Sequence, residues 1–179
     1  MKRISVILTA FFLILTGCKK DKIPPLSGTV TIDNNLEGDD KTGYYAFGFS
    51  FALAKKVSTM DTPPPDITID NDGTLANLIL QANNLNNSFF KVGEFADATS
   101  AQQAFNNLTS PAVPQPADWA EWAYYIKPNQ IWIYRSQSEH YSKFRILSSR
   151  YVDRDPRDFA ECTFEWVYQP DGSLTFPGK

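Results

Sequence analysis

The strongest constraint on the fold is an alternation of large and small residues across positions 43–57. The large residues are Tyr45, Phe47, Phe49, Phe51 and Leu53, and the small ones are Ala46, Gly48, Ser50, Ala52 and Ala54. A period of two gathers side chains on one face of a β-strand, whereas a helix would scatter them around its circumference. The sequence therefore predicts one long strand with a heavy apolar face. The small residues predict close packing against its other face.

The C-terminal third contains four apolar segments separated by short polar connections. These predicted strands are 130–135, 141–147, 159–168 and 173–176, joined through 136–140, 149–157 and 170–172. Short connections make consecutive strands antiparallel neighbours. In the third strand, Cys162, Phe164, Trp166 and Tyr168 share one face, while Glu161, Thr163 and Glu165 share the other. This pattern predicts one face on the core and an acidic, solvent-facing one opposite.

The rest of the chain predicts further strands and a single helix. We expect a short strand at 29–32, a polar loop at 33–40, a hairpin of 66–69 with 75–80 around Asn71-Asp72-Gly73, and a strand at 89–95. Residues 98–108 form the one helical pattern, with Asp97 or Thr99 placed to cap it. The predicted fold class is therefore all-β, mostly antiparallel, with one short helix near 98–108.

The first eighteen residues predict export and lipid attachment. Lys2 and Arg3 precede an apolar run at 4–16 that is shorter than the roughly 20 residues needed to span a bilayer. The following Leu15-Thr16-Gly17-Cys18 resembles the lipobox of bacterial lipoproteins, which implies cleavage before Cys18 and acylation of that cysteine. Two or more acyl chains would make the attachment to a membrane effectively permanent.

These features divide the chain into a signal peptide at 1–17, a lipidated tether at 18–27 and one domain at 28–179. The whole chain carries 17 Lys and Arg against 20 Asp and Glu, and cleavage would remove the positive charges of Lys2 and Arg3. An acidic domain is a poor match for phosphate backbones, so we expect no nucleic-acid partner. With Cys18 acylated, Cys162 is the one remaining thiol and no intramolecular disulfide is possible.

The catalytic and metal motifs in the sequence are incomplete. Ser50 lies within a predicted strand and lacks the closing glycine of a nucleophile elbow. Asp70, Asp72 and Gly73 echo a calcium loop, but the tight-turn interpretation explains them better. Glu161 and Glu165 could present paired carboxylates, although an exposed strand face is commonly acidic. We therefore expect a protein that is not an enzyme.

The candidate ligand-binding residues are Met60, Trp119, Trp122, Tyr124 and His140. His140, the one histidine, is either a metal or haem ligand or a solvated residue of a turn. Met60 is either a haem ligand or an exposed loop residue. The two tryptophans, with Tyr124 and Tyr125, either stack on a flat ligand or sugar ring from one helical turn or pack in the core.

Segments at both ends of the predicted domain carry a resemblance to a known family. Near the start they are Tyr45-Ala46-Phe47-Gly48-Phe49-Ser50 leading to Lys55-Lys56-Val57, and then Pro65-Asp66-Ile67-Thr68-Ile69. Near the end they are Ile131-Trp132-Ile133-Tyr134-Arg135, Tyr141-Ser142-Lys143-Phe144-Arg145-Ile146, and the strand at 163–168. Together they resemble the HmuY-type haem-binding lipoproteins of Gram-negative bacteria.

The resemblance implies a nearly all-β fold, exposure at the cell surface or in the periplasm, and transfer of haem to an outer-membrane receptor. In that family two side chains from the middle of the chain hold the iron. Here residues 81–125 contain neither histidine nor methionine, so neither axial ligand has a matching position.

The function we expect is that of an outer-membrane lipoprotein anchored through Cys18, on the cell-surface or periplasmic face. It would bind haem or another flat hydrophobic ligand and pass it to an uptake partner such as an outer-membrane receptor or transporter. The alternative is a structural or accessory interaction lipoprotein of a surface uptake complex, without a small-molecule ligand.

Overall fold

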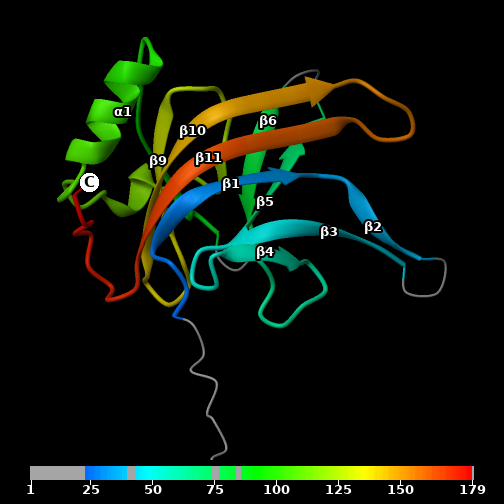
Figure 1. The fold of residues 1–179 in the computed structure, drawn as a ribbon, viewed down its shortest axis with the longest axis horizontal. Helices are drawn as coiled ribbons and strands as arrows, with labels where there is room; N and C mark the ends of the chain where they lie inside the picture. Colours follow the sequence, from blue (N-terminus) through cyan, green and yellow to red (C-terminus); the bar gives the residue numbers. More distant parts are fainter. Residues whose placement is uncertain (1–22, 40–42, 74–76, 84–85, 179) are drawn as a thin grey trace, which may run out of the picture.

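Two mainly antiparallel sheets pack face to face in the computed structural model, which describes residues 23–39, 43–73, 77–83 and 86–178 (Figure 1). The predicted signal peptide and Cys18 lie outside these residues. Within them, no helix is both long enough and apolar enough to cross a membrane. The predicted all-β class with a single α-helix is confirmed.

The first sheet is a meander closed by the N-terminal strand. Its strands, in spatial order, are β1 (Ser27–Asp33), β11 (Phe159–Gln169), β10 (Tyr141–Val152), β9 (Gln130–Arg135) and β7 (Phe89–Glu94). Every pairing is antiparallel. The register sets Ser27 opposite Val167 and Asp33 opposite Glu161, so β1 begins where β11 ends.

The second sheet is built around strand β3 (Gly43–Ser50). In order its strands are β2 (Leu36–Asp39), β3, β5 (Ile67–Asn71), β6 (Leu78–Ala82) and β8 (Trp122–Ala123), and β4 (Lys55–Ser58) pairs with β3. Strands β5 and β6 form the hairpin predicted around Asn71-Asp72-Gly73. Strand β2 occupies part of 33–40, so the prediction of an unbroken polar loop there is wrong. The reason is that 36–39 pair with β3, a long-range contact that composition does not reveal.

The predicted single strand at 43–57 is wrong, because the chain reverses after Ser50. Residues 51–54 form a turn in which Ala54 has a φ of 50°, and β4 then pairs back onto β3. Phe51 is buried, whereas Leu53, two positions further, is 42% exposed. The close packing predicted for the small residues is found at Gly48, where a Cβ would lie 2.2 Å from the carbonyl oxygen of Ile67.

The main core fills the space between the sheets and is rich in aromatic rings. The predicted apolar face of β11 is confirmed, with Phe164 and Trp166 pointing into this core. Phe49 packs against both of them, at centroid distances of 5.8 and 5.2 Å. Because such edge and tilted contacts add to the area that each ring buries, the aromatic cluster holds the two sheets together.

Helix α1 (Ala98–Asn107) covers the outer face of the first sheet (Figure 1). Of the two predicted capping candidates, Asp97 is the one that caps it, accepting a hydrogen bond from the Ser100 backbone N–H at 2.8 Å. Phe105 packs there with Ile131, Ile133, Val167, Trp119 and Phe176 in a second apolar cluster. The outer face of β11 is therefore partly covered.

Two cations of β10 lie buried beneath this helix. Nζ of Lys143 donates to the carbonyl oxygens of Phe105 and Leu108, at 2.7 and 2.9 Å, near the C-terminus of α1. Nε of Arg145 lies 2.5 Å from a carboxylate oxygen of Glu165. The predicted solvent-facing role of Glu165 is therefore wrong, because the helix shields it and an arginine neutralises it.

Two boundaries in the C-terminal third also differ from the prediction. Strand β10 continues to Val152, into the predicted 149–157 connection, because a bulge between Ile146 and Ser148 lets pairing resume. Residues 173–176 form no strand. Instead Phe176 is buried in the second cluster, and its backbone N–H donates to the carbonyl oxygen of Thr109 at 2.7 Å.

Candidate functional site

A cavity of about 250 Å³ opens at the end of the sandwich where β1 begins. The turn after β3, the start of β5, the β9–β10 loop and the end of β11 all contribute to its walls. Its lining includes the side chains of Phe51, Asp66, Tyr134, Ser136, His140 and Tyr168. The cavity therefore combines aromatic walls with a carboxyl, an imidazole and hydroxyl groups.

His140 is held in this cavity by a tight loop and by a tyrosine. The Ser136 N–H donates to the His140 carbonyl at 2.9 Å, and the His140 N–H donates to Oγ of Ser136 at 3.1 Å. Nδ1 of the ring lies 3.0 Å from the hydroxyl of Tyr168. With Nδ1 engaged, the other ring nitrogen is the one left for a ligand.

Asp66 presents a carboxyl to the same cavity. Its Oδ2 accepts a hydrogen bond from the Phe51 backbone N–H at 2.7 Å, and the Tyr134 hydroxyl lies 3.4 Å from Oδ1. Burial raises the pKa of this carboxyl above its ordinary value of 3.8, although these hydrogen bonds act in the opposite direction. Burial also raises the pKa of both tyrosine hydroxyls, Tyr134 and Tyr168. The two phenols therefore stay protonated at neutral pH.

A buried hydroxyl without a partner lies beside these walls. Ser142 is opposite Tyr134 in β9 and opposite Tyr168 in β11, and it is fully buried. Within the described residues its Oγ makes no hydrogen bond. A buried hydroxyl is costly to leave without a hydrogen-bond partner. The end of β10 next to the cavity therefore holds an unsatisfied polar group.

The residues predicted to bind ligand are not brought together. Of these candidates, His140 lines the cavity, whereas Met60 is outside its lining and 70% exposed. Trp119 belongs to the second apolar cluster and is 6% exposed, with the Arg135 guanidinium 4.4 Å from its ring centroid. Trp119 therefore packs in the core, which is the second of the two alternatives stated for it.

Trp122 and Tyr124 form a separate row of rings with Tyr125. The centroids of Trp122 and Tyr124 lie 5.5 Å apart, and those of Tyr124 and Tyr125 lie 6.1 Å apart. The helical turn that the ligand-stacking alternative required between Trp119 and Trp122 is not observed, because a short 3-10 helix ends at Asp118 and Trp122 belongs to strand β8. Tyr124 and Tyr125 are 38% and 53% exposed, so this row lies at the surface.

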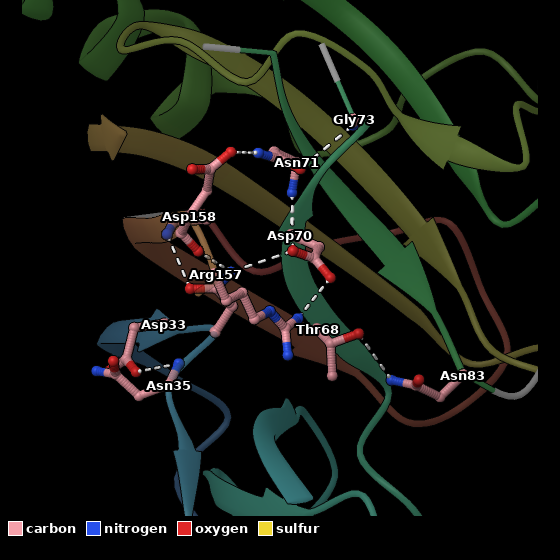
Figure 2. Close-up of polar contacts among 11 residues, drawn as sticks. Asp33, Asn35, Thr68, Asp70, Asn71, Gly73, Asn83, Arg157 and Asp158 are labelled. Atoms are coloured by element: carbon pink, nitrogen blue, oxygen red, sulfur yellow. Dashed lines mark hydrogen bonds and ion pairs between the residues drawn. The ribbon is translucent and has the colours of Figure 1, made fainter. Parts of the chain in front are cut away.

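The end of the sandwich opposite to the cavity carries a polar network between the two sheets (Figure 2). Asn34 is buried and donates from Nδ2 to Oδ1 of Asp70 at 3.1 Å and to the carbonyl of Asp158 at 2.9 Å. Asn71 donates to Oδ2 of Asp158 at 2.8 Å, and Arg157 lies 2.7 Å from Oδ2 of Asp70. Asn71, predicted to lie in the hairpin turn, is the last residue of β5 and helps to link the two sheets.

Sequence reasoning missed Asp66 and the two tyrosines as cavity residues. The available signal for Asp66 was a lone carboxylate between three prolines and an alternating apolar strand. Among the described residues, no group of three or more His, Cys, Asp and Glu side chains could hold a metal ion. The chain matches no protein-family model, no curated protein and no solved structure.

Proposed function

We propose that this chain is a lipid-anchored, non-enzymatic binding protein of the outer membrane that holds one edge of a flat ligand in the cavity around His140. The observation that carries the proposal is the convergence of Asp66, His140 and Tyr168 from three separate segments on one aromatic-walled cavity. Cys18 supplies the anchor, and an outer-membrane receptor or transporter would receive the ligand.

The size of the cavity favours partial insertion. Its volume of about 250 Å³ is below the roughly 300–1,000 Å³ typical of pockets that enclose a drug-sized molecule. Phe51, Tyr134 and Tyr168 line the cavity but are 1%, 1% and 8% exposed, so a ligand would meet only the margins of these rings. Asp66 and Ser136 offer polar groups for the edge of the ligand. The ligand would therefore insert one edge of its ring system into the cavity. The rest of the ring system would stay outside or be covered by the partner.

Haem is the candidate ligand that the His140 geometry favours. A histidine that ligates a metal through one ring nitrogen usually hydrogen-bonds through the other, and Tyr168 supplies that second contact at 3.0 Å. Met60 is a weaker candidate because its side chain is outside the cavity lining. The HmuY-type resemblance points to the same ligand class.

The test is a titration of the full chain in detergent with haem, followed by absorbance, and with metal-free protoporphyrin IX, followed by fluorescence. We expect saturable binding of haem with a shifted spectrum in wild type and in Met60→Ala, and loss of that shift in His140→Ala. If protoporphyrin bound but the absorbance spectrum of haem did not shift, the flat-ligand proposal would stand and ligation of the iron would be excluded. Failure of both probes to saturate would overturn the proposal.

A second candidate is the accessory interaction lipoprotein without a small ligand. The exposed row of Trp122, Tyr124 and Tyr125 favours it, because large aromatic side chains at a surface are typical of protein interfaces. If neither porphyrin binds, co-purification of an uptake-complex protein that is lost in Tyr124→Ala would support this second function.

A further inference from the structure

A second hollow lies at the other end of the first sheet, beside the β10–β11 connection. It has a volume of about 240 Å³ and is lined by Arg150, Val152, Arg154 and Phe159. The guanidinium carbons of Arg150 and Arg154 lie 5.5 and 5.0 Å from the centroid of the Phe159 ring. Two cations therefore contact one aromatic ring and border one hollow.

The side chains of these two arginines lack a carboxylate partner within the described part of the chain. Neither forms an ion pair there, whereas the neighbouring Arg157 is paired with Asp70 at 2.7 Å. Arg154 donates to uncharged acceptors, the Arg157 carbonyl at 3.0 Å and Oδ1 of Asn35 at 2.7 Å. Arg150 is opposite Glu161 in the strand register but forms no ion pair with it.

The backbone that carries Arg154 is tied to the body of the sandwich. Asp158 accepts hydrogen bonds from the Arg154 backbone N–H at 3.3 Å and from the Tyr151 hydroxyl at 2.9 Å. It also accepts one from Asn71 of the second sheet at 2.8 Å (Figure 2). Because these contacts order the loop before any ligand arrives, a ligand at Arg154 would not bear the cost of ordering it.

We propose that this hollow binds a phosphate monoester whose phosphate contacts Arg150 and Arg154. Both guanidinium groups lie within 5.5 Å of the Phe159 ring centroid and border the same hollow, so a dianionic group with several acceptor oxygens placed there would accept hydrogen bonds from both. Phe159 and Val152 supply apolar surface for the body of the ester. The site is independent of the His140 cavity and of the function proposed for it.

The hollow lies far from Ser27, near which the predicted tether ends. Strand β1 runs from Ser27, at the cavity end, to Asp33, next to Asn35 and Arg154, and seven extended residues cover about 20 Å. The arginines therefore lie at the end of the domain away from Ser27. A phosphate ester could reach them as a soluble molecule or as a lipid headgroup, and the two sources are separable by experiment.

The test is isothermal titration calorimetry of the full chain in detergent at low ionic strength. One arm uses phenyl phosphate, and the other uses dihexanoyl phosphatidic acid below its micelle concentration. We expect one saturable site that weakens with added salt, and that loses about tenfold in affinity in Arg150→Gln and in Arg154→Gln. Tighter binding of phenyl phosphate assigns a soluble ester, and tighter binding of phosphatidic acid assigns a lipid headgroup.

The matched control is Lys55→Gln, which removes one exposed positive charge from strand β4, away from the hollow. It should bind phenyl phosphate as wild type does, and all variants should keep the wild-type melting temperature. An equal loss of affinity in Lys55→Gln would overturn the site, because net charge alone would then explain binding. Absence of saturable heat with both phosphates, or equally tight binding of benzoate, would overturn the assignment of a phosphate ligand.

Discussion

The hydroxyl of Tyr168 lies 3.0 Å from Nδ1 of His140, although 28 residues separate the two in the chain. The contact crosses from the last residues of β11 to the loop before β10, which begins beside the end of β11 in the register. It orients the single imidazole of the chain at the wall of the cavity. A histidine in a short polar turn is thereby held in place at the cavity wall.

Replacing Tyr168 with phenylalanine should weaken haem binding about tenfold, because the imidazole loses the contact that orients it. Titration of haem, followed by absorbance, measures the loss. The ¹⁵N shifts of the His140 ring should also change, since the tautomer is no longer selected. Tyr124→Phe, which removes an exposed hydroxyl elsewhere, is the control. Unchanged affinity and unchanged ring shifts in Tyr168→Phe would show that the contact orients nothing.

Asp66→Asn should flatten the pH dependence of stability. Because burial raises the pKa of the Asp66 carboxyl in the folded protein above 3.8, the folded state keeps a proton that the unfolded chain has released. The stabilisation that the protonated carboxyl contributes is therefore fully present below pH 3.8, and it is lost as the pH rises through the raised pKa.

The amide introduced by Asp66→Asn stays uncharged at every pH, so this variant should be more stable than wild type at neutral pH. Urea unfolding at several pH values measures both curves. Asp61→Asn, at an exposed position in the neighbouring loop, is the control and should keep the wild-type slope. If the free energy of unfolding of Asp66→Asn varied with pH as steeply as that of wild type, the Asp66 carboxyl would not be the source of the pH dependence.

Gly48→Ala should destabilise the fold by about 3 kcal/mol, because overpacking a tight contact forces strands apart. The new Cβ would lie 2.2 Å from the Ile67 carbonyl oxygen and 2.7 Å from Cβ of Pro65. Gly93→Ala is the matched control, since its Cβ would meet Phe95 at an ordinary 3.4 Å. That variant should be neutral or slightly stabilising. Chemical unfolding compares the two, and equal effects would contradict this packing.

Lys143→Met should lower the free energy of unfolding by about 2 kcal/mol, because the hydrogen bonds from the ammonium group to the carbonyl oxygens of Phe105 and Leu108, near the end of helix α1, are lost. Methionine keeps the length of the apolar stem, so the loss reports the hydrogen bonds and charge. Lys127→Met, at an exposed position, should change stability little. Thermal unfolding measures both variants. A Lys143→Met protein as stable as wild type would show that the capping contact contributes nothing net.

The alternation of side-chain types along the sequence predicted most strands well. The predictions that were wrong have one physical cause in common. The alternation through 43–57 continues past Ser50, so nothing local marks the reversal that Asp66 stabilises by accepting the Phe51 N–H. Glu165 carries the pattern of an exposed residue, yet a helix from another part of the chain buries it against Arg145. In both cases a partner distant in sequence decides the outcome.

The all-β class, the core-facing side of β11 and the single helix that begins near Asp97 were predictable from the sequence alone, since each depends on residues close together in the chain. Only the tertiary structure decided that His140 meets Tyr168 and shares a cavity with Asp66, that Trp119 is buried apart from Trp122, and that Arg150 and Arg154 share one ring. These relationships depend on strand register and sheet packing, which arise from the summed burial of many side chains and leave no short-range pattern.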